Sequence, residues 1–374
     1  MDSKIRILHF PIGNTKGGAT QYAMQNWKFI DKSKFHFDFA TMSPYVDFED
    51  KINQSGAKLF FIRNYAENNS QKFREEFYDV LLQGRYDIVH LHTGRWKSTF
   101  AEQVAKEAGV KRIIIHAHST GMATESETER EKNLLRHQEI VANLSIDIAT
   151  DYWACSRAAS KFLFADSIPE ERVHIMPNAI DIERFAFRQD IREKVRKEMG
   201  WKDSYVIGHI GRFVYPKNQE FLLKLIKHLI SFIPSIKLVL VGDGVNLERC
   251  KEYTYQNNLD EHVVFTGYRA DTERLLQAFD VFALPSEFEG VSLALIEAQA
   301  AGLPCYASDC MPTDAGITES VKFIPLQIED WSDQIQKDFQ SRQKRADNIE
   351  KLKLAGYDIR DQIKAVEKGY LGIY

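Results

Sequence analysis

The sequence lacks the features that mark several common classes of protein. It has only four cysteines and no C-x-x-C pair, so buried free thiols in a reducing compartment are the simplest expectation. No apolar run approaches membrane-spanning length, and the first ten residues carry charges within their apolar stretch, unlike a signal peptide. The net charge of −4 does not suit a nucleic-acid binder, which normally has a basic face. These absences favour a cytoplasmic globular protein.

What the sequence does contain is a repeated pattern of short apolar runs and helical segments. At 374 residues the chain is too long for one ordinary core, so two domains are expected. Hydrophobic residues make up 44% of it and charged residues 27%, as in globular proteins. Alternation of this kind predicts parallel sheets with crossover helices. The strands predicted in the first half cover residues 5–10, 35–41, 59–62, 87–92, 112–118 and 152–156.

The most informative stretch is residues 280–304, which read DVFALPSEFEGVSLALIEAQAAGLP. Residues 281–284 form an apolar run long enough for a buried strand, and Pro285 ends it. Gly290 lies in the polar loop that follows, and apolar residues at helical spacing then lead to Gly302, which closes a helix. This order puts a loop and a helix N-terminus at the carboxyl end of a strand. Open α/β sheets bind ligands there, and the helix N-terminus favours an anion such as phosphate.

Two glutamates of this stretch, Glu289 and Glu297, are spaced E-x7-E. The stretch resembles the signature of retaining glycosyltransferases of family 4, which have the GT-B fold. Its sequence is most similar to that of the branch that builds bacterial capsular polysaccharides and exopolysaccharides. The resemblance implies that Glu289 lies by the donor sugar and diphosphate and that Glu297 binds the ribose hydroxyls. Gly290, Val291 and Ser292 would line the donor site, although many members read E-G-F-G-L where this chain has Val291 and Ser292.

The second half also contains candidate ligands for the diphosphate. A predicted strand ends at Gly211, so Arg212 and Lys217 project from its carboxyl end. Their G-R-x4-K-N pattern resembles the diphosphate-binding pair of the family. A leaving nucleoside diphosphate gains charge as the glycosidic bond breaks, and fixed cations stabilise that charge. Tyr268 and Arg269 follow another predicted strand, and the corresponding family segment contacts the base through backbone atoms.

A glycine pair, Gly17 and Gly18, ends the first loop before a predicted helix. Approach of a phosphate and a tight turn explain the pair equally well. The loop is not a G-x-G-x-x-G, which counts against a dinucleotide-dependent enzyme. By resemblance it corresponds to the loop of the N-terminal domain that faces the donor.

Four histidines form two H-x-H pairs near the ends of neighbouring predicted strands. A metal site is not indicated, because neither pair has a third ligand nearby. Hydrogen-bonded histidines at strand ends are the preferred interpretation for His90, His92 and His116. His118 matches the active-site histidine of the family, which points at the donor sugar. Residues 121–133, which are polar and charged, are interpreted as a mobile loop on the acceptor side.

The resemblance covers nearly the whole chain and implies an α/β GT-B fold, with two Rossmann-like domains facing across a cleft. Residues 1–182 would form the N-terminal, acceptor-side domain, together with a C-terminal helix at 357–374 that crosses back to it. Residues 183–356 would form the domain that binds the nucleotide sugar. The boundary rests on residues 172–185, which resemble the hinge sequence of the family.

The implied activity is transfer of a sugar from a nucleotide-sugar donor, with UDP the favoured nucleotide, to a saccharide or lipid-linked saccharide acceptor. No cofactor and no metal are expected, since the chain has no Asp-x-Asp, the motif with which the other large transferase fold holds a cation. No nucleic-acid partner is expected. The expected location is the cytoplasm, and peripheral association with the inner face of the membrane stays open.

Other functions also stay open. A glycoside hydrolase would need two carboxyl groups roughly 5–9.5 Å apart, whereas eight helical residues rise about 12 Å, so the E-x7-E spacing fits poorly. A nucleotide-sugar epimerase or a hydrolase on the same GT-B fold is the more serious alternative. A catalytically silent GT-B binding module would have no need to keep the charged set Arg212, Lys217, Glu289 and Glu297.

Overall fold

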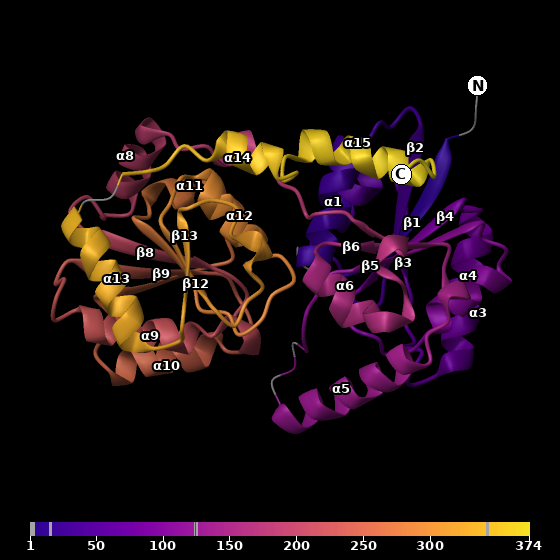
Figure 1. Cartoon of the computed structure of the whole chain (residues 1–374), viewed down its shortest axis with the longest axis horizontal. Helices are drawn as coiled ribbons and strands as arrows, with labels where there is room; N and C mark the ends of the chain where they lie inside the picture. The colour runs from indigo at the N-terminus through magenta and orange to yellow at the C-terminus, as the bar shows by residue number, and fades with distance from the viewer. Residues whose placement is uncertain (1–3, 15–16, 123, 125, 342–343) are drawn as a thin grey trace. The chain divides into compact units, whose positions relative to one another are not determined.

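The computed structural model describes residues 4–14, 17–122, 124, 126–341 and 344–374. The chain forms two α/β units, each built on one parallel sheet with helices around it (Figure 1). The first unit comprises Met1–Met122, Ser126–Ala179 and Ile359–Tyr374, and the second contains Ile180–Asp358. The boundary expected after residue 182 falls at the start of α7 (Ile182–Phe185), next to the division at Ala179.

The first unit is organised around a seven-stranded sheet in the order β3-β2-β1-β4-β5-β6-β7, with every pair parallel. Such a sheet is buried on both faces, and so its strands are near-continuous apolar runs. The strands are β1 (Ile5–Ile12), β2 (Phe35–Thr41), β3 (Leu59–Phe61), β4 (Ile88–Thr93), β5 (Arg112–Ala117), β6 (Asp151–Ala154) and β7 (Val173–Ile175).

Seven α-helices belong to the described part of this unit, and the last of them comes from the C-terminal segment. Helix α1 packs on β1 and against α15, while α3 packs against α4, which covers β4 and β5. The helices are α1 (Gly18–Phe29), α2 (Glu49–Gln54), α3 (Ser70–Gly84), α4 (Phe100–Glu107), α5 (Glu127–Ala142), α6 (Arg157–Phe164) and α15 (Ile359–Tyr370).

The second unit has a six-stranded parallel sheet in the order β10-β9-β8-β11-β12-β13. Its strands are β8 (Tyr205–Ile210), β9 (Ile236–Val241), β10 (Val263–Gly267), β11 (Val281–Leu284), β12 (Cys305–Ser308) and β13 (Val321–Ile324). The helices after α7 are α8 (Gln189–Glu198), α9 (Gln219–Leu229), α10 (Leu247–Gln256), α11 (Thr272–Ala278), α12 (Leu293–Ala300), α13 (Ile328–Ser341) and α14 (Ile349–Leu354).

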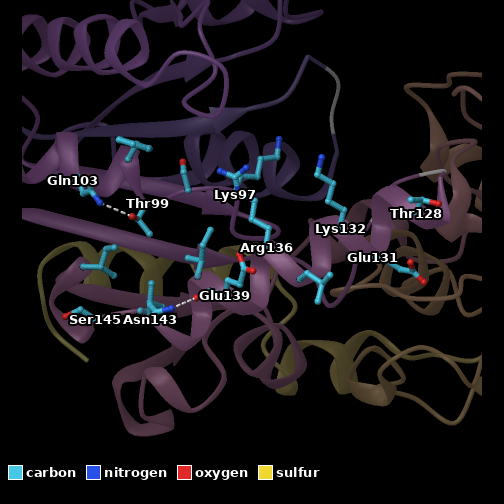
Figure 2. Close-up of a pocket in the computed structure, with 16 residues that line it drawn as sticks. Lys97, Thr99, Gln103, Thr128, Glu131, Lys132, Arg136, Glu139, Asn143 and Ser145 are labelled. Carbon is cyan, nitrogen blue, oxygen red and sulfur yellow. Dashed lines mark hydrogen bonds between the residues drawn. The ribbon is translucent and has the colours of Figure 1, made fainter.

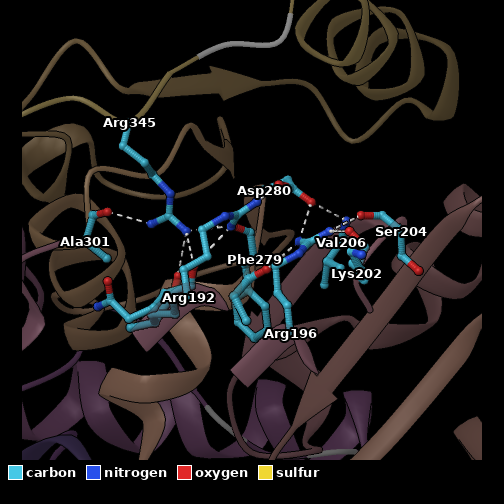
Figure 3. A network of polar contacts seen from close by, with 12 residues as sticks. Arg192, Arg196, Lys202, Ser204, Val206, Phe279, Asp280, Ala301 and Arg345 are labelled. Carbon is cyan, nitrogen blue, oxygen red and sulfur yellow. Dashed lines mark hydrogen bonds and ion pairs between the residues drawn. The ribbon is translucent and has the colours of Figure 1, made fainter. Parts of the chain in front are cut away.

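A network of arginines fixes the beginning of β11 (Figure 3). The Asp280 carboxylate accepts hydrogen bonds from Arg192, from Arg196 and from the backbone N–H of Val206. Arg345 donates to carbonyls at the C-terminal ends of α11 and α12, where unpaired oxygens concentrate partial negative charge. Burial lowers the pKa of Arg345 to about 9. Strand β11 is therefore anchored at its amino end. The carbonyls that Arg345 contacts are those of Leu276, Gln277, Phe279 and Ala301.

The predicted elements agree with the structure except in two places. The interpretation of residues 121–133 as a loop is wrong beyond Glu127, because α5 begins there and the Ser126 hydroxyl caps its N-terminus. The short edge strand β7 was not predicted, because it lies inside the segment interpreted as a hinge. No helix in the described part of the chain combines the length and the apolar character needed to cross a membrane.

Helix α15 completes the core of the first unit. Ile363, Val366 and Tyr370 are buried in one cluster with residues of β1, β2, β4 and β5. Arg112 of β5 donates to the carbonyl oxygens of Gly369, at 3.0 Å, and Tyr370, at 2.6 Å. A helix bound by both core packing and charged hydrogen bonds is a structural part of this unit.

We expect Val366→Asp to destabilise the protein strongly, because it buries an unpaired charge at a position with no solvent exposure. The midpoint of thermal unfolding should fall and dye binding should report exposed apolar surface. Removal of residues 357–374 should do the same and reduce solubility. The matched control is Val245→Asp, since Val245 is 74% exposed. Truncated protein as soluble and cooperative as the full chain would contradict this role.

Candidate active site

The predicted diphosphate ligands lie where two neighbouring strands of the second unit end. Strand β8 leads into the loop with Arg212 and Lys217, and its neighbour β11 leads into the loop with Glu289. Lys217 Nζ forms an ion pair with the Glu289 carboxylate, and the Ser286 hydroxyl donates to Glu289 Oε1 at 2.9 Å. Arg212 is an exposed residue. The structure thus brings Lys217 and Glu289 together across 72 residues of sequence, with Arg212 close by in the chain.

The loop after β9 shapes the loop that holds Arg212. A Cβ atom on Gly242 would lie 2.0 Å from the carbonyl oxygen of Gly211, and one on Gly244 would lie 2.4 Å from that of Phe213. Both glycines also have φ values, 142° and 151°, that other residues rarely adopt. Only glycine therefore allows this close backbone approach. No role was predicted for these two glycines, and the G-x-G directly after a strand was the signal available.

The loop from Gly290 leads into α12. Ser292 is the N-cap residue of α12, and its buried hydroxyl makes no hydrogen bond to the described residues. The first N–H groups of a helix have no partner within the helix, and with the helix dipole they favour an anion. Val291 is buried beside them. Gly290, Val291 and Ser292 therefore sit at a helix N-terminus next to Glu289, and their role in donor binding stays a prediction.

Glu297 lies inside α12 and is 7% exposed. The pKa of its carboxyl group is raised to about 8, chiefly by burial. Arg184 acts to lower this pKa and Glu273 acts to raise it. Arg184 itself pairs with Glu273 at 2.9 Å. Glu297 is therefore largely protonated at neutral pH unless a bound ligand stabilises its charge.

The two residues predicted to contact the base, Tyr268 and Arg269, follow β10. Tyr268 is 62% exposed, and Gly267 before it has a φ of 67°. The Arg269 guanidinium makes two hydrogen bonds to Asp271 at 2.8 Å, so its side chain is engaged within its own loop. A role for these residues through backbone atoms stays a prediction.

In the first unit, Gly17 is the N-cap residue of α1, which begins at Gly18. Gly17 has a φ of −70°, so its backbone does not need glycine. Among the described residues, a Cβ atom on either glycine would meet nothing within 4 Å. The tight-turn explanation is therefore weakened, while space for a ligand at this helix N-terminus remains.

Five histidines from β1, β4, β5 and the residue after β5 form one cluster, which we call the histidine cluster. Strands β1, β4 and β5 are neighbours, and alternate residues of each point to the same face. Hydrogen-bonded histidines, as predicted, are therefore found. The statement that no third metal ligand lies nearby is wrong, since two triplets have ring nitrogens within 4.8 Å of one another. The members are His9, His90, His92, His116 and His118.

A pocket with a volume of about 1090 Å³ lies elsewhere in the first unit. Helix α5 forms one side, and residues around the start of α4 form the other (Figure 2). Lys132, Arg136, Glu131 and Glu139 give it charges of both signs, and Leu135 adds an exposed apolar surface. None of the predicted site residues lines this pocket.

Comparison with known proteins identifies the family. The family model "Glycosyl transferases group 1" matches residues 191–354, and "Glycosyltransferase Family 4" matches residues 16–184. EpsF of Bacillus subtilis (strain 168), whose name describes it as a glycosyltransferase, is 34% identical over 98% of this chain and 97% of its own. The chain belongs to the family 4 glycosyltransferases.

Two other proteins are similar to this glycosyltransferase, one in sequence and one in structure. The Escherichia coli UDP-Gal:alpha-D-GlcNAc-diphosphoundecaprenol alpha-1,3-galactosyltransferase is 29% identical over 82% of this chain and 80% of its own. The crystal structure of Anabaena HepE with UDP and glucose has a TM-score of 0.77 and 17% identity, covering 99% of this chain and 100% of that one. The structural match confirms the GT-B fold.

The raised pKa of Glu297 predicts that the stability of this glycosyltransferase depends on pH. The folded carboxyl titrates at about 8 and the unfolded one near 4.5. The folded state therefore binds more protons between these values, and the free energy of unfolding falls as pH rises through that window. Above pH 8 the loss in free energy of unfolding caused by ionisation of Glu297 is complete, and it is on the order of a few kcal/mol.

We therefore expect Glu297→Gln, which cannot ionise, to gain stability over the parent protein as pH rises from about 5 to about 8. Urea unfolding at a series of pH values measures the difference. Glu170→Gln is the control, because Glu170 is exposed. A difference that does not change with pH would show that Glu297 ionises freely in the folded protein.

Proposed function

We propose that this protein is a retaining glycosyltransferase that moves a hexose from a nucleotide sugar to a saccharide or lipid-linked saccharide acceptor in surface polysaccharide biosynthesis. The observation that carries the proposal is the contact between Lys217 and Glu289 beside the N-terminus of α12. It joins a fixed cation, a carboxylate and a helix N-terminus, which suit a diphosphate and the sugar attached to it.

UDP is the proposed nucleotide. The E. coli relative is named for a UDP-sugar donor, and the HepE structure contains UDP and glucose. The same relative is named for an acceptor carried on diphosphoundecaprenol, which supports a lipid-linked acceptor here. Such an acceptor implies that the enzyme works in the cytoplasm at the inner face of the membrane, with peripheral association.

The proposed chemistry places the cations at the leaving group. As the bond between the anomeric carbon and the phosphate oxygen breaks, Arg212 and Lys217 stabilise the growing negative charge. The acceptor oxygen bonds to the same face of the sugar, and its proton passes to the departing phosphate. Glu289 holds sugar hydroxyls, and His118 steadies the donor sugar. No described carboxylate is assigned as a nucleophile, and no metal is assigned a role.

A thermal-shift screen across nucleotide sugars tests the donor. A ligand at 100 times its dissociation constant adds roughly 2.7 kcal/mol of stability, so the correct base and sugar should give the largest shift. Mass spectrometry with acceptor present then separates transfer from epimerisation and from simple hydrolysis. Both steps are run with a chelator, and activity abolished by the chelator and restored by manganese would refute metal independence. A chain that binds donors but converts none would be a binding module.

We expect Arg212→Ala and Lys217→Ala each to lower turnover by roughly a hundredfold or more, with the fold intact. Losing one preorganised donor at developing charge typically costs on the order of 3 kcal/mol. Steady-state kinetics on the donor found in the screen measure the loss. Lys224→Ala and Arg249→Ala make the same changes on α9 and α10, away from this loop, and should act like the parent protein. Parent-like rates in the first two variants would remove these cations from the mechanism.

We also expect retention of configuration, because the motif set resembles that of retaining enzymes and the acceptor oxygen bonds to the face of the sugar that the phosphate leaves. An α-linked donor should give an α-linked product, which NMR of the new linkage identifies. His118→Ala and Glu289→Gln should lower transfer far more than nucleotide affinity, and His228→Ala on α9 serves as the control. A β-linked product would make the mechanism wrong even with the family correct.

A further inference from the structure

Two buried polar side chains, His209 and Gln219, lie at the two ends of the loop that carries Arg212 and Lys217. His209 belongs to β8 and has no solvent exposure, and Gln219 is the first residue of α9 and is 2% exposed. Polar side chains as deeply buried as these need hydrogen-bond partners. We call the two residues the His–Gln pair.

Hydrogen bonds connect the His–Gln pair both to the neighbouring strand and to the loop. His209 Nδ1 lies 2.9 Å from the carbonyl oxygen of Ala283 in β11. Gln219 Nε2 lies 3.2 Å from His209 Nε2 and 2.8 Å from the carbonyl oxygen of Arg212. An unbroken path of hydrogen bonds therefore runs from β11 through both side chains to the backbone of Arg212.

The carbonyl oxygens at the two ends of this path fix the direction of its hydrogen bonds. A carbonyl oxygen only accepts, so His209 carries its hydrogen on Nδ1 and Gln219 turns its NH2 group towards Arg212. That group has a second hydrogen, which it donates to the lone pair on His209 Nε2. The reversed amide would set its oxygen against the carbonyl oxygen of Arg212. One tautomer and one amide orientation therefore satisfy all three contacts.

The His–Gln pair also lies beside the stem of Lys217. A Cβ atom on Gly211 would lie 3.0 Å from His209 Nε2 and 3.3 Å from Cδ of Lys217, so the ring and the stem both lie close to this glycine. The pKa of His209 is lowered to about 4, chiefly by burial and also by the charge of Lys217. The ring is therefore neutral at ordinary pH, as the hydrogen bonds require.

Other contacts hold the second half of the loop. The N–H of Glu287 donates to the carbonyl oxygen of Pro216 at 2.8 Å, and Lys217 Nζ pairs with the Glu289 carboxylate. These contacts join the second half to the loop after β11. The peptide of Arg212 is joined to β11 through the His–Gln pair instead.

We propose that His209 and Gln219 are positioning residues that hold Arg212 and Lys217 where the diphosphate binds. The inference rests on the proposed function, in which these cations act on the charge that develops at the leaving group. A fixed backbone at Arg212 lets its guanidinium meet that charge without reorganisation. Displacement of such a group by about 1 Å can lower a rate on the order of a hundredfold. Neither His209 nor Gln219 is assigned a contact with the substrate.

Hydrogen exchange tests the hold on the loop without any substrate. Gln219→Met keeps the length of the side chain but removes its donors. We expect the hydrogen-bonded amides of Phe213 and Lys217 to exchange roughly fivefold faster or more, as for the loss of one hydrogen bond. The amides of β9 should exchange as in the parent protein.

Thr254→Val is the matched control for this experiment. Thr254 is buried on α10, and its hydroxyl donates to the carbonyl oxygen of Cys250 at 2.9 Å, so the variant also loses one buried hydrogen bond of the second unit. Its loop amides should exchange as in the parent protein. Loop exchange that is unchanged in Gln219→Met, or equally faster in both variants, would overturn the proposal whether or not the protein is a transferase.

Nitrogen NMR of protein labelled with ¹⁵N at histidine tests the direction of the hydrogen bonds. In the parent protein His209 should carry its hydrogen on Nδ1. In Gln219→Met the Nε2 signal of His209 should move towards the value of an acceptor without a partner. A hydrogen on Nε2, or an Nε2 signal that does not respond to the substitution, would contradict the proposal.

Affinity and turnover test the effect on the cations. Gln219→Met should weaken the binding of UDP and of inorganic pyrophosphate, whereas Thr254→Val should not. Once a donor is known, kcat of Gln219→Met should fall about tenfold, with a smaller change in KM, because the cations act mainly on developing charge. Parent-like affinity and kcat would refute the positioning role. A parent protein that binds neither probe would instead refute the proposed function and leave the loop result standing.

Gln219→Glu is a second variant that keeps the shape of the side chain, in case Gln219→Met folds poorly. An ionised carboxylate cannot donate to the Arg212 carbonyl, whereas a protonated carboxyl group can. The affinity for UDP relative to the parent protein should therefore recover as the pH falls. A ratio that stays constant with pH would show that the donor at this position has no role in binding.

Discussion

Parallel pairing of the strands is the constraint on which the rest of this structure depends. Because all strands of a sheet point the same way, the loops after β8, β9, β10 and β11 open on one edge. The cations, the E-x7-E loop and the close-packed glycines all follow these strands. At the opposite end of β11, Asp280 and its arginines hold the strand in place. Local binding chemistry in the second unit is thus a consequence of sheet geometry.

Most of the fold could be predicted from the sequence, because strands buried on both faces are visible as apolar runs. Strands β2 and β11 begin and end at the residues predicted for them, and α12 follows the loop that contains Glu289 as expected. Edge strand β7 could not be found in this way, since three residues with partial exposure carry little signal. Helix α5 was missed at its start because its first turns are polar on most sides.

The residue types of the candidate site could be predicted better than the contacts between those residues. The resemblance suggested Lys217 and Glu289, but their ion pair depends on the pairing of β8 with β11, which no local pattern encodes. The histidines show the same limit. His92 and His116 are partners in the register of β4 and β5, and His9 and His90 in that of β1 and β4. The H-x-H pairs on neighbouring strands were the available signal for the cluster.

The position of α15 has a consequence for the order in which the protein folds during synthesis. Domains made on the ribosome usually fold from the N-terminus onwards. Here the first unit lacks Val366 and Tyr370, both fully or almost fully buried in its core, until the ribosome has made the whole second unit. The histidines of β1, β4 and β5 would have no contact with Tyr370 throughout that interval. Part of the apolar core of the nascent first unit therefore stays uncovered until synthesis is nearly complete, while the second unit already holds every strand of its sheet.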